Sequence, residues 1–428
     1  MKPKNKFQQH VLELSKRLSQ ITEPQKRWAY KHCFDHIGKR NAKGIITCLE
    51  CGHKWNGGNG YLADTLLDCE CPNCSTKLEV DTTKKRVFKE TEYFGMITTC
   101  GGYQVIRFFY INAYRKAGQP IEYTCTEVVQ RWIAPNGRTA TVARLRQMSI
   151  MYYDLWDISS RLEIRPNHRS HDITPAQFYP RQRFIPEVTR NGFTGAYHKI
   201  APFDLFRSIL TDSKAETLLK AGQYSLLKYL VNSQSERVAN YWASLRIAIR
   251  NGYTIEDGSI WCDYIEQLNF FGKDTNSPKY VCPDNLHQQH DLYTKRRRAY
   301  NERLELERKR QKARENEEKF KELKGKFFGI AFTDGTIQVR VLESVDEYME
   351  EGKAMHHCVF DGSYFLRAES LVLSATIDGK RIETVEISLK TLKVVQSRGV
   401  CNKNTEYHNR IIKLVNKNIR QIRSRIAA

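Results

Sequence analysis

Two pairs of cysteines in the first eighty residues place the tightest constraint on how this chain can fold. Cys48 and Cys51 are separated by two residues, as are Cys71 and Cys74, and 19 residues lie between the pairs. This C-x2-C…C-x2-C spacing allows two tight turns to aim four thiolates at one tetrahedral ion, about 2.3 Å from each sulfur. The spacing therefore predicts a zinc ribbon whose structural Zn2+ is bound by Cys48, Cys51, Cys71 and Cys74.

Two alternatives remain open at this motif. Cys69 lies two residues before Cys71 and could replace one of the four ligands. The cysteines could also be buried thiols that bind no metal. In each case we expect reduced thiols, because no secretory signal with an apolar core follows the basic N-terminal residues.

The charge of the chain indicates a polyanionic partner. Lys and Arg total 69 against 48 Asp and Glu, so the 428 residues carry a formal net charge of +21. An excess of this size usually accompanies binding to nucleic acid, DNA or RNA, although a solvated basic surface gives the same count. No apolar run in the sequence approaches the ~18 residues of a membrane span. We therefore expect a cytoplasmic protein with no membrane insertion.

Periodicity along the chain predicts a multidomain α+β protein. Apolar residues at helical spacing dominate the N-terminal and middle segments, whereas runs of β-formers separated by turn signals follow the cysteine motif. A long charged stretch then precedes a mixed C-terminal segment. The expected parts are N-terminal helices (1–43), the zinc ribbon (44–86), an antiparallel β region (87–200), a helical domain (201–285), a long basic helix or linker (286–326) and a C-terminal α+β domain (327–428).

The long helix, expected over about Leu286–Lys324, carries two basic runs that are candidate phosphate contacts. Its sparse apolar positions suit an exposed linker stabilised by Glu–Lys and Glu–Arg pairs equally well. They also suit an assembly scaffold that recruits partner proteins. The candidate nucleic-acid-binding residues are Lys295, Arg296, Arg297, Arg298, Arg308, Lys309 and Arg310.

The C-terminal segment alternates strand and helix signals. Asp-Gly pairs at 334–335 and 378–379 predict two β-hairpins. Ser344 and Glu347 form a capping-box pattern, which predicts a short helix that ends near Gly352. An amphipathic helix with a basic surface, about Thr405–Ile426, is expected to close the domain.

A dense group of reactive side chains follows the short helix. His356, His357 and Cys358 are adjacent, and two later strands carry Glu386 and Gln396. Because side chains alternate along a strand, Glu386 points away from the apolar face of its strand or lines a polar pocket. If the two strands pair, Glu386 and Gln396 converge near the His357-Cys358 turn.

Three interpretations of this group remain open. A thiolate beside an imidazole is a nucleophile, so the group could be the active site of a hydrolase or transferase. It could instead be a metal site that joins His356 or His357 to Cys358. Further metal ligands would come from Glu386, Cys401 or His408. The third interpretation is a structural cluster, or a binding pocket for a nucleotide, a peptide or a nucleic-acid end. The candidate catalytic residues are His357, Cys358, Tyr364, Glu386 and Gln396.

Short motifs in the second half of the chain give it a family resemblance. The motifs are Pro283-Asp284-Asn285-Leu286 with His290-Asp291, Glu351-Gly352, His357-Cys358-Val359 with Tyr364, Thr384-Val385-Glu386, and Gln396-Ser397-Arg398-Gly399 with Asn402. In this order they resemble the PcfJ-like proteins over about residues 200–425. His356 departs from the pattern, because this position varies in the family and is often basic.

The resemblance implies a protein of conjugative plasmids, integrative elements or phages, with protein partners in a conjugation or phage system. Together with the charge and the cysteine motif, it favours a nucleic-acid-associated accessory protein of a mobile genetic element. An enzyme centred on Cys358 and an assembly scaffold built on the long helix are the alternatives. The sequence leaves open whether the protein is an enzyme.

Overall fold

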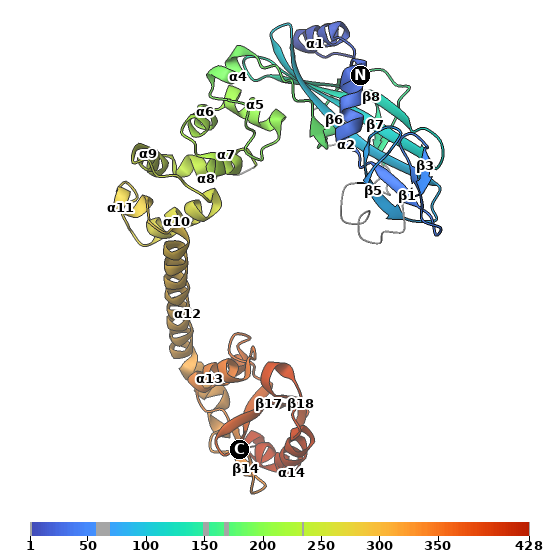
Figure 1. Cartoon of the computed structure of the whole chain (residues 1–428). Coiled ribbons are helices and arrows are strands. Elements are labelled where there is room, and N and C mark those ends of the chain that lie inside the picture. Colours follow the sequence, from blue (N-terminus) through green and yellow to red (C-terminus); the bar gives the residue numbers. More distant parts are fainter. Residues whose placement is uncertain (1, 57–68, 149–153, 167–170, 233–234, 428) are drawn as a thin grey trace. The chain divides into compact units, whose positions relative to one another are not determined.

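The computed structural model describes residues 2–56, 69–148, 154–166, 171–232 and 235–427. It is a mixed α and β structure that divides into two compact units, Met1–His290 and Asp291–Ala428 (Figure 1). Among the described residues, no helix combines the length and the apolar character needed to cross a membrane.

The first unit begins with helices α1 (Lys6–Arg17) and α2 (Glu23–Cys33), followed by a small sheet. Its strands are β1 (Ile37–Arg40), β2 (Ile45–Cys48), β3 (Lys54–Asn56), β4 (Cys69–Glu70) and β5 (Lys77–Thr82), in the order β3-β2-β1-β5-β4. Strand β1 corrects the expectation of helix throughout residues 1–43. It forms because its backbone pairs antiparallel with β2 and parallel with β5, a tertiary contact that local periodicity does not reveal.

A larger sheet follows, with the order β12-β9-β8-β7-β6-β13. Its strands are mostly antiparallel, as expected for this region, but β13 pairs in parallel with β6. The odd-numbered side chains of β7 contact both N-terminal helices, Val105 packing near α1 and Phe109 near α2. The strands are β6 (Val87–Cys100), β7 (Tyr103–Lys116), β8 (Glu122–Ile133), β9 (Thr139–Ala143), β12 (Glu163–Arg165) and β13 (Gln177–Phe178), and β10 (Arg146–Met148) pairs separately with β11 (Asp154–Trp156).

Short helices complete the first unit and confirm the helical region predicted after residue 200. Two of them start at aspartates that accept backbone N–H hydrogen bonds, Asp212 before α6 and Asp257 before α10. The helices are α4 (Pro186–Arg190), α5 (Pro202–Thr211), α6 (Ser213–Lys220), α7 (Tyr224–Val231), α8 (Ser235–Asn240), α9 (Trp242–Arg250), α10 (Gly258–Phe270) and α11 (Pro278–Val281).

The predicted long helix is confirmed as α12, Leu286–Lys324. Most of it belongs to the second unit, whose sheet has the order β14-β15-β16-β17-β18 with antiparallel neighbours. Both predicted hairpins, β14–β15 and β16–β17, are present. The remaining elements are β14 (Ala331–Thr333), β15 (Ile337–Val341), α13 (Val345–Met355), the 3-10 turn η3 (Tyr364–Leu366), β16 (Ser370–Ile377), β17 (Lys380–Ser388), β18 (Lys393–Arg398), the 3-10 turn η4 (Val400–Asn402) and α14 (His408–Ala427).

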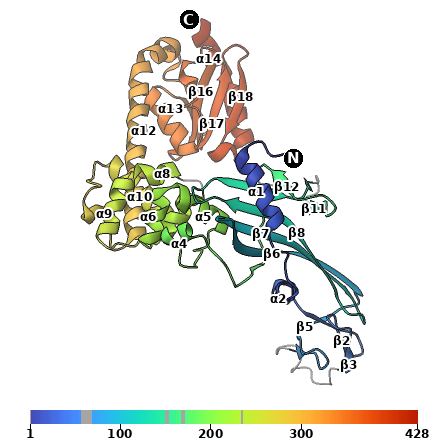
Figure 2. The same ribbon diagram turned by 90° about the horizontal axis from the view of Figure 1, so that it is seen from above.

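The two faces of this second sheet differ in character, and α13 and α14 lie on opposite sides of it (Figure 2). On one face Leu373 and Val385 pack against the apolar stripe of α14. Because side chains alternate, Ser374, Thr384 and Glu386 belong to the other face, and all three are buried. Buried polar groups need hydrogen-bond partners, so this face can hold a polar site within the fold.

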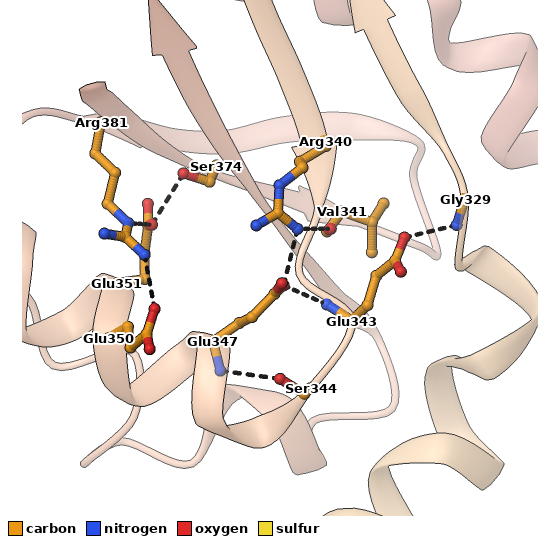
Figure 3. Close-up of polar contacts among 10 residues, drawn as sticks. All are labelled: Gly329, Arg340, Val341, Glu343, Ser344, Glu347, Glu350, Glu351, Ser374 and Arg381. Atoms are coloured by element: carbon orange, nitrogen blue, oxygen red, sulfur yellow. Dashed lines mark hydrogen bonds and ion pairs between the residues drawn. The ribbon is translucent and has the colours of Figure 1, made fainter. Parts of the chain in front are cut away.

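Helix α13 starts with only half of the predicted capping box. The Ser344 hydroxyl accepts a hydrogen bond from the Glu347 backbone N–H at 3.1 Å (Figure 3). The Glu347 carboxylate accepts instead from the Glu343 N–H at 2.8 Å and from the Arg340 guanidinium at 2.9 Å. A cation from the neighbouring strand β15 therefore captures the carboxylate that the sequence pattern assigns to the cap.

Candidate functional site

The four predicted cysteine ligands converge on one point. The sulfur atoms of Cys48, Cys51, Cys71 and Cys74 all lie within 4.8 Å of one another. The Sγ–Sγ distance is 3.8 Å for Cys48–Cys74 and 3.7 Å for Cys51–Cys71. A tetrahedral ion with sulfur ligands at about 2.3 Å requires sulfur–sulfur edges of about 3.8 Å. The arrangement thus has the size of a tetrahedral thiolate site, and these cysteines could hold a metal ion.

The two halves of this cluster are equivalent turns. The N–H of Gly52 donates to the carbonyl of Cys48, and the N–H of Ser75 donates to the carbonyl of Cys71, in both cases four residues after the first cysteine of the pair. Both positions have left-handed backbone, with φ of 80° at Gly52 and 53° at Ser75. Cys69 lies outside the cluster, because it is in β4 and pairs with Leu78 of β5.

The local environment changes the proton affinity of the thiols in opposite directions. Burial raises the pKa of the Cys48 and Cys71 thiols above its usual value. Burial also acts on Cys51, but hydrogen bonds from the Asn73 side chain and the His53 backbone outweigh it and lower the pKa of Cys51 to about 7. Because thiolates bind metal, loading this site releases protons and depends on pH.

Glu50, between the first two cysteines, ties the cluster to the larger sheet. Its carboxylate accepts a hydrogen bond from the Tyr123 hydroxyl at 2.8 Å and lies 3.1 Å from His36 Nδ1 and 3.6 Å from Arg115 Nε. Burial raises the pKa of Glu50, but the nearby His36 imidazole and the Tyr123 hydrogen bond outweigh it and lower this pKa below its usual value. The cysteine turn is therefore anchored to β7 and β8 by a half-buried carboxylate.

The second candidate site is a polar pocket of about 200 Å³ in the second unit. It is lined by all five residues that the sequence selects as candidate catalytic groups: His357, Cys358, Tyr364, Glu386 and Gln396. Val359, Val372, Thr384, Arg398 and Asn402 complete the lining. The pocket therefore joins residues that are up to 45 positions apart in the sequence, from His357 to Asn402.

A tight turn after α13 positions His357. Helix α13 continues to Met355 rather than ending near Gly352, and His356 ends it in the left-handed conformation with φ of 54°. Gly352 lies inside the helix, where a Cβ would be 3.0 Å from the carbonyl oxygen of His357. The His357 Nε2 lies 2.7 Å from the carbonyl oxygen of Gly399, so this nitrogen donates a proton and Nδ1 of the neutral ring keeps its lone pair.

Glu386 and Gln396 meet in the pocket because they are directly opposite each other on β17 and β18. The Gln396 Nε2 donates to Glu386 Oε2 at 2.8 Å, and the Ser370 hydroxyl donates to Glu386 Oε1 at 2.7 Å. Both donors are neutral, so Glu386 is held in place by hydrogen bonds. Cys358 is exposed at the pocket rim, which leaves its thiol accessible.

A second buried carboxylate, Glu351, lies beside the pocket and is absent from the residues that the sequence selects. It is fully buried and accepts hydrogen bonds from Ser374 Oγ at 2.9 Å and from Arg381 Nε at 2.8 Å (Figure 3). Thr384 Oγ1 donates a third hydrogen bond at 2.7 Å. The sequence feature that could have revealed Glu351 is its position between Tyr348 and Met355 on the buried stripe of α13. A buried glutamate on an apolar stripe needs hydrogen-bond donors, and here the sheet of the second unit supplies them.

A third buried carboxylate, that of Glu383, belongs to β17 and lies on the other face of the sheet. It contacts the residues at the start of α14. It accepts hydrogen bonds from the Ser397 hydroxyl, from the Thr405 N–H at 2.9 Å and from His408 Nδ1 at 3.0 Å. Burial raises the pKa of Glu383, but these hydrogen bonds outweigh it and lower this pKa below its usual value of 4.5. His408 is thus engaged in this network.

Within the described residues, the cysteine cluster is the one group of three or more His, Cys, Asp or Glu side chains close enough to hold a metal ion. The alternative metal site around His356, His357 and Cys358 therefore does not assemble there. Glu386 has neutral hydrogen-bond donors as partners instead.

The candidate nucleic-acid-binding residues lie on the middle of α12. Lys295, Arg296, Arg298, Arg308 and Arg310 are exposed, whereas Arg297 and Lys309 are half-buried. Lys309 lies 3.2 Å from Asp361 and 3.6 Å from Glu305, so its charge is partly compensated. The helix carries exposed cations, but the half-buried Lys309 contributes instead to the packing of α12 against the loop after α13.

Helix α14 carries a more uniform basic surface. Its 20 residues include six Lys or Arg side chains and no Asp or Glu. Arg410 pairs with Asp334 at 2.6 Å. Lys413, Lys417 and Arg420 are exposed on one stripe, and none of them pairs with a carboxylate of the described residues. They span eight residues, or about 10 Å of helix.

One family model matches part of the chain. The family model of PcfJ-like protein matches residues 260–412, a range that contains every residue of the polar pocket. The match confirms the resemblance seen in the sequence motifs. No curated protein and no solved structure matches the chain.

Proposed function

We propose that this protein binds nucleic acid as an accessory protein of a mobile genetic element, and that its four cysteines hold a structural Zn2+. The observation that carries the proposal is the acid-free stripe of Lys413, Lys417 and Arg420 on α14. Exposed cations that have no acidic partner displace the counterions condensed around nucleic-acid phosphates. The release of these counterions is the main source of affinity for a nucleic-acid backbone. The net charge of +21 and the PcfJ-like match support the same proposal.

The basic runs of α12 extend the proposed interface. Arg296 and Arg298 are exposed, and no Asp or Glu occurs between Asp291 and Glu302. Such a run attracts a polyanion from a distance and positions it without reading its sequence. The assembly-scaffold role of the same helix stays a prediction.

Zinc is proposed because its preferred geometry fits the cysteine cluster. Four thiolates at tetrahedral spacing select a thiophilic ion, and a closed four-sulfur site is structural. The bound ion would fix the two cysteine turns, which in turn hold the small sheet β3-β2-β1-β5-β4. The residues of this chain then act as ligands only.

The test is the salt dependence of binding to a labelled oligonucleotide, measured by fluorescence anisotropy. If the three α14 cations and one α12 cation contact phosphates of a single strand, log K falls with log salt with a slope of about −2.8, at about −0.7 per contact. Affinity then drops about 50-fold between 50 and 200 mM salt. Binding that is absent or independent of salt refutes the proposal.

A matched pair of variants locates the interface. Replacing Lys413, Lys417 and Arg420 together by Gln removes three contacts, so the slope falls by about 2. Three exposed cations of the helical region in the first unit serve as the control, because their removal changes the net charge equally. The control replaces Arg207, Lys228 and Arg250 by Gln and leaves the slope unchanged.

Catalysis in the polar pocket is the second candidate function, and one observation favours it. An accessible thiol, an imidazole with a free lone pair and a carboxylate fixed by two donors line one pocket of about 200 Å³. These are the groups of a nucleophilic or acid–base site in a hydrolase or transferase. If Cys358→Ala and Glu386→Gln both fold normally and retain full activity in transfer of the mobile element, catalysis is excluded.

A further inference from the structure

The polar pocket is too small to enclose a drug-sized molecule. Its volume of about 200 Å³ is below the roughly 300–1,000 Å³ that enclose a drug-sized molecule. It can accept one unit of a larger molecule, and the rest of that molecule must lie along the adjoining surface. The adjoining surface therefore indicates what the pocket binds.

A groove of about 590 Å³ adjoins the pocket along the edge of the sheet. It runs between β18, the edge strand, and the first half of α14. Gln396 and Arg398 line both the groove and the pocket, so the two meet at the edge strand β18, from opposite faces of the sheet. The other groove residues are Lys393, Val394, Val395, Ser397, Asn404, His408, Ile412 and Asn416.

The groove has cationic and neutral walls. Lys393 and Arg398 line it, and none of its lining residues is Asp or Glu. The Arg398 guanidinium is held by Asn404 Oδ1 at 2.6 Å, a neutral partner that leaves its charge uncompensated. Lys413 and Lys417 on the adjacent part of α14 continue the same sign of charge. Charge complementarity therefore favours an anionic chain as the occupant.

The pocket offers the contacts that one nucleotide needs. His357 supplies a ring against which a base can stack, and Tyr364 supplies the ring face opposite the one that the Arg367 guanidinium covers at 3.5 Å from the centroid. The Gln396 amide and the Glu386 carboxylate supply a donor and an acceptor for the polar edge of a base. A base can enter such a pocket only when it is unpaired, because a duplex buries its bases in the stack.

We propose that the pocket and the groove form one binding site for single-stranded nucleic acid, with phosphates in the β18–α14 groove and one base in the pocket beside Cys358. This inference rests on the proposed nucleic-acid function and adds its substrate class and its location. Lys393 and Arg398 contact phosphates, and Tyr364, Glu386 and Gln396 hold the base.

The first test compares a short single-stranded oligonucleotide with a duplex of the same length, using the full chain. The double variant Lys393→Gln/Arg398→Gln should weaken single-strand binding at least fivefold and reduce the salt slope by about 1.4, at about 0.7 per phosphate contact. The control Lys380→Gln/Lys319→Gln removes two exposed cations of the same unit that line neither cavity, and should bind like the unmodified protein.

The second test measures the alkylation rate of Cys358 by mass spectrometry. Cys401 is also exposed but lies outside the lining of the pocket, so it serves as the internal reference. A bound single strand should slow alkylation of Cys358 at least fivefold and of Cys401 less than twofold. The duplex should protect neither thiol.

The outcomes separate this inference from the broader proposal. If single strands bind with the expected salt dependence but the double variant binds normally and Cys358 is unprotected, the site is wrong and the nucleic-acid function stands. If no nucleic acid binds, both are overturned. Protection of Cys358 by an extended peptide, without protection by an oligonucleotide, would replace this inference with strand pairing at β18.

Discussion

Removing the buried Glu351 carboxylate should destabilise the second unit far more than removing its exposed neighbour Glu350. Both glutamates contact the same guanidinium, that of Arg381, at 2.8 Å from Glu351 and 3.2 Å from Glu350. The exposed fraction of the side chain is 0% for Glu351 and 64% for Glu350. The pair therefore compares a buried with an exposed contact to one partner.

The magnitude follows from the groups that Glu351→Ala leaves behind. The hydroxyls of Ser374 and Thr384 are buried and lose their acceptor, and each unsatisfied buried donor costs about 1–3 kcal/mol. Arg381 keeps Glu350 as a partner. The expected loss is therefore about 4 kcal/mol, whereas Glu350→Ala removes an exposed ion pair worth about 0–1 kcal/mol.

Hydrogen exchange measured by mass spectrometry is the suitable assay, because bulk unfolding of a chain with two units mixes their transitions. A loss of about 4 kcal/mol raises the opening equilibrium of β16 and β17 about a thousandfold at 1.36 kcal/mol per decade. Peptides from β6 and β7 of the first unit should be unchanged. Equal effects of the two variants, or full protection of β16 and β17 in Glu351→Ala, would refute this reasoning.

Three further predictions concern the metal centre, the pH dependence and a close backbone contact. Metal analysis of the purified protein should find one zinc per chain; Cys71→Ser should abolish it, and Cys69→Ser should retain it because Cys69 lies outside the cluster. The lowered pKa of Glu383 means that its contribution to stability is present above pH 4.5 and is lost as the pH falls through the lower folded-state value. Urea midpoints between pH 6 and 3 should fall accordingly, and Glu383→Gln should flatten that decline; an unchanged slope would count against the network. Gly399→Ala places a Cβ 2.9 Å from a backbone oxygen and should cost about 1–3 kcal/mol in thermal unfolding. The control Gly325→Ala, with no heavy atom within 4 Å, should cost less than about 1 kcal/mol, and equal effects would remove the steric explanation.

Local patterns were sufficient for much of the fold. The long charged stretch with Glu–Lys and Glu–Arg pairs at helical spacing predicts α12 over Leu286–Lys324, and the Asp-Gly pairs predict both hairpins of the second unit's sheet. These features depend on neighbours within a few residues, which is the range over which helix and turn preferences act. The long helix is also detectable because few apolar residues interrupt its charged pattern.

Other features arise only from contacts between distant segments. Strand β1 forms because β5, some forty residues later, supplies a parallel partner. The Glu347 carboxylate bonds to Arg340 instead of completing the capping box. Helix α13 extends to Met355, and the chain turns back in the left-handed conformation at His356. No local propensity encodes these competing partners.

The two candidate sites also differ in how far the local sequence determines them. The spacing of the cysteines by itself determines that Cys48, Cys51, Cys71 and Cys74 can converge, because each pair forms one local turn and only the two turns must meet. The alternation rule also places Glu386 on a polar face.

Only the tertiary structure decided how the C-terminal pocket is built. The register of β17 and β18 sets Glu386 opposite Gln396, and the carbonyl of Gly399 orients His357. Glu351 becomes a buried acceptor because two strands bring hydroxyl donors to it. Hydrogen-bond partners across a sheet are fixed by strand register and packing, which a single sequence does not specify. Two cysteines separated by two residues are positioned instead by the local turn that joins them.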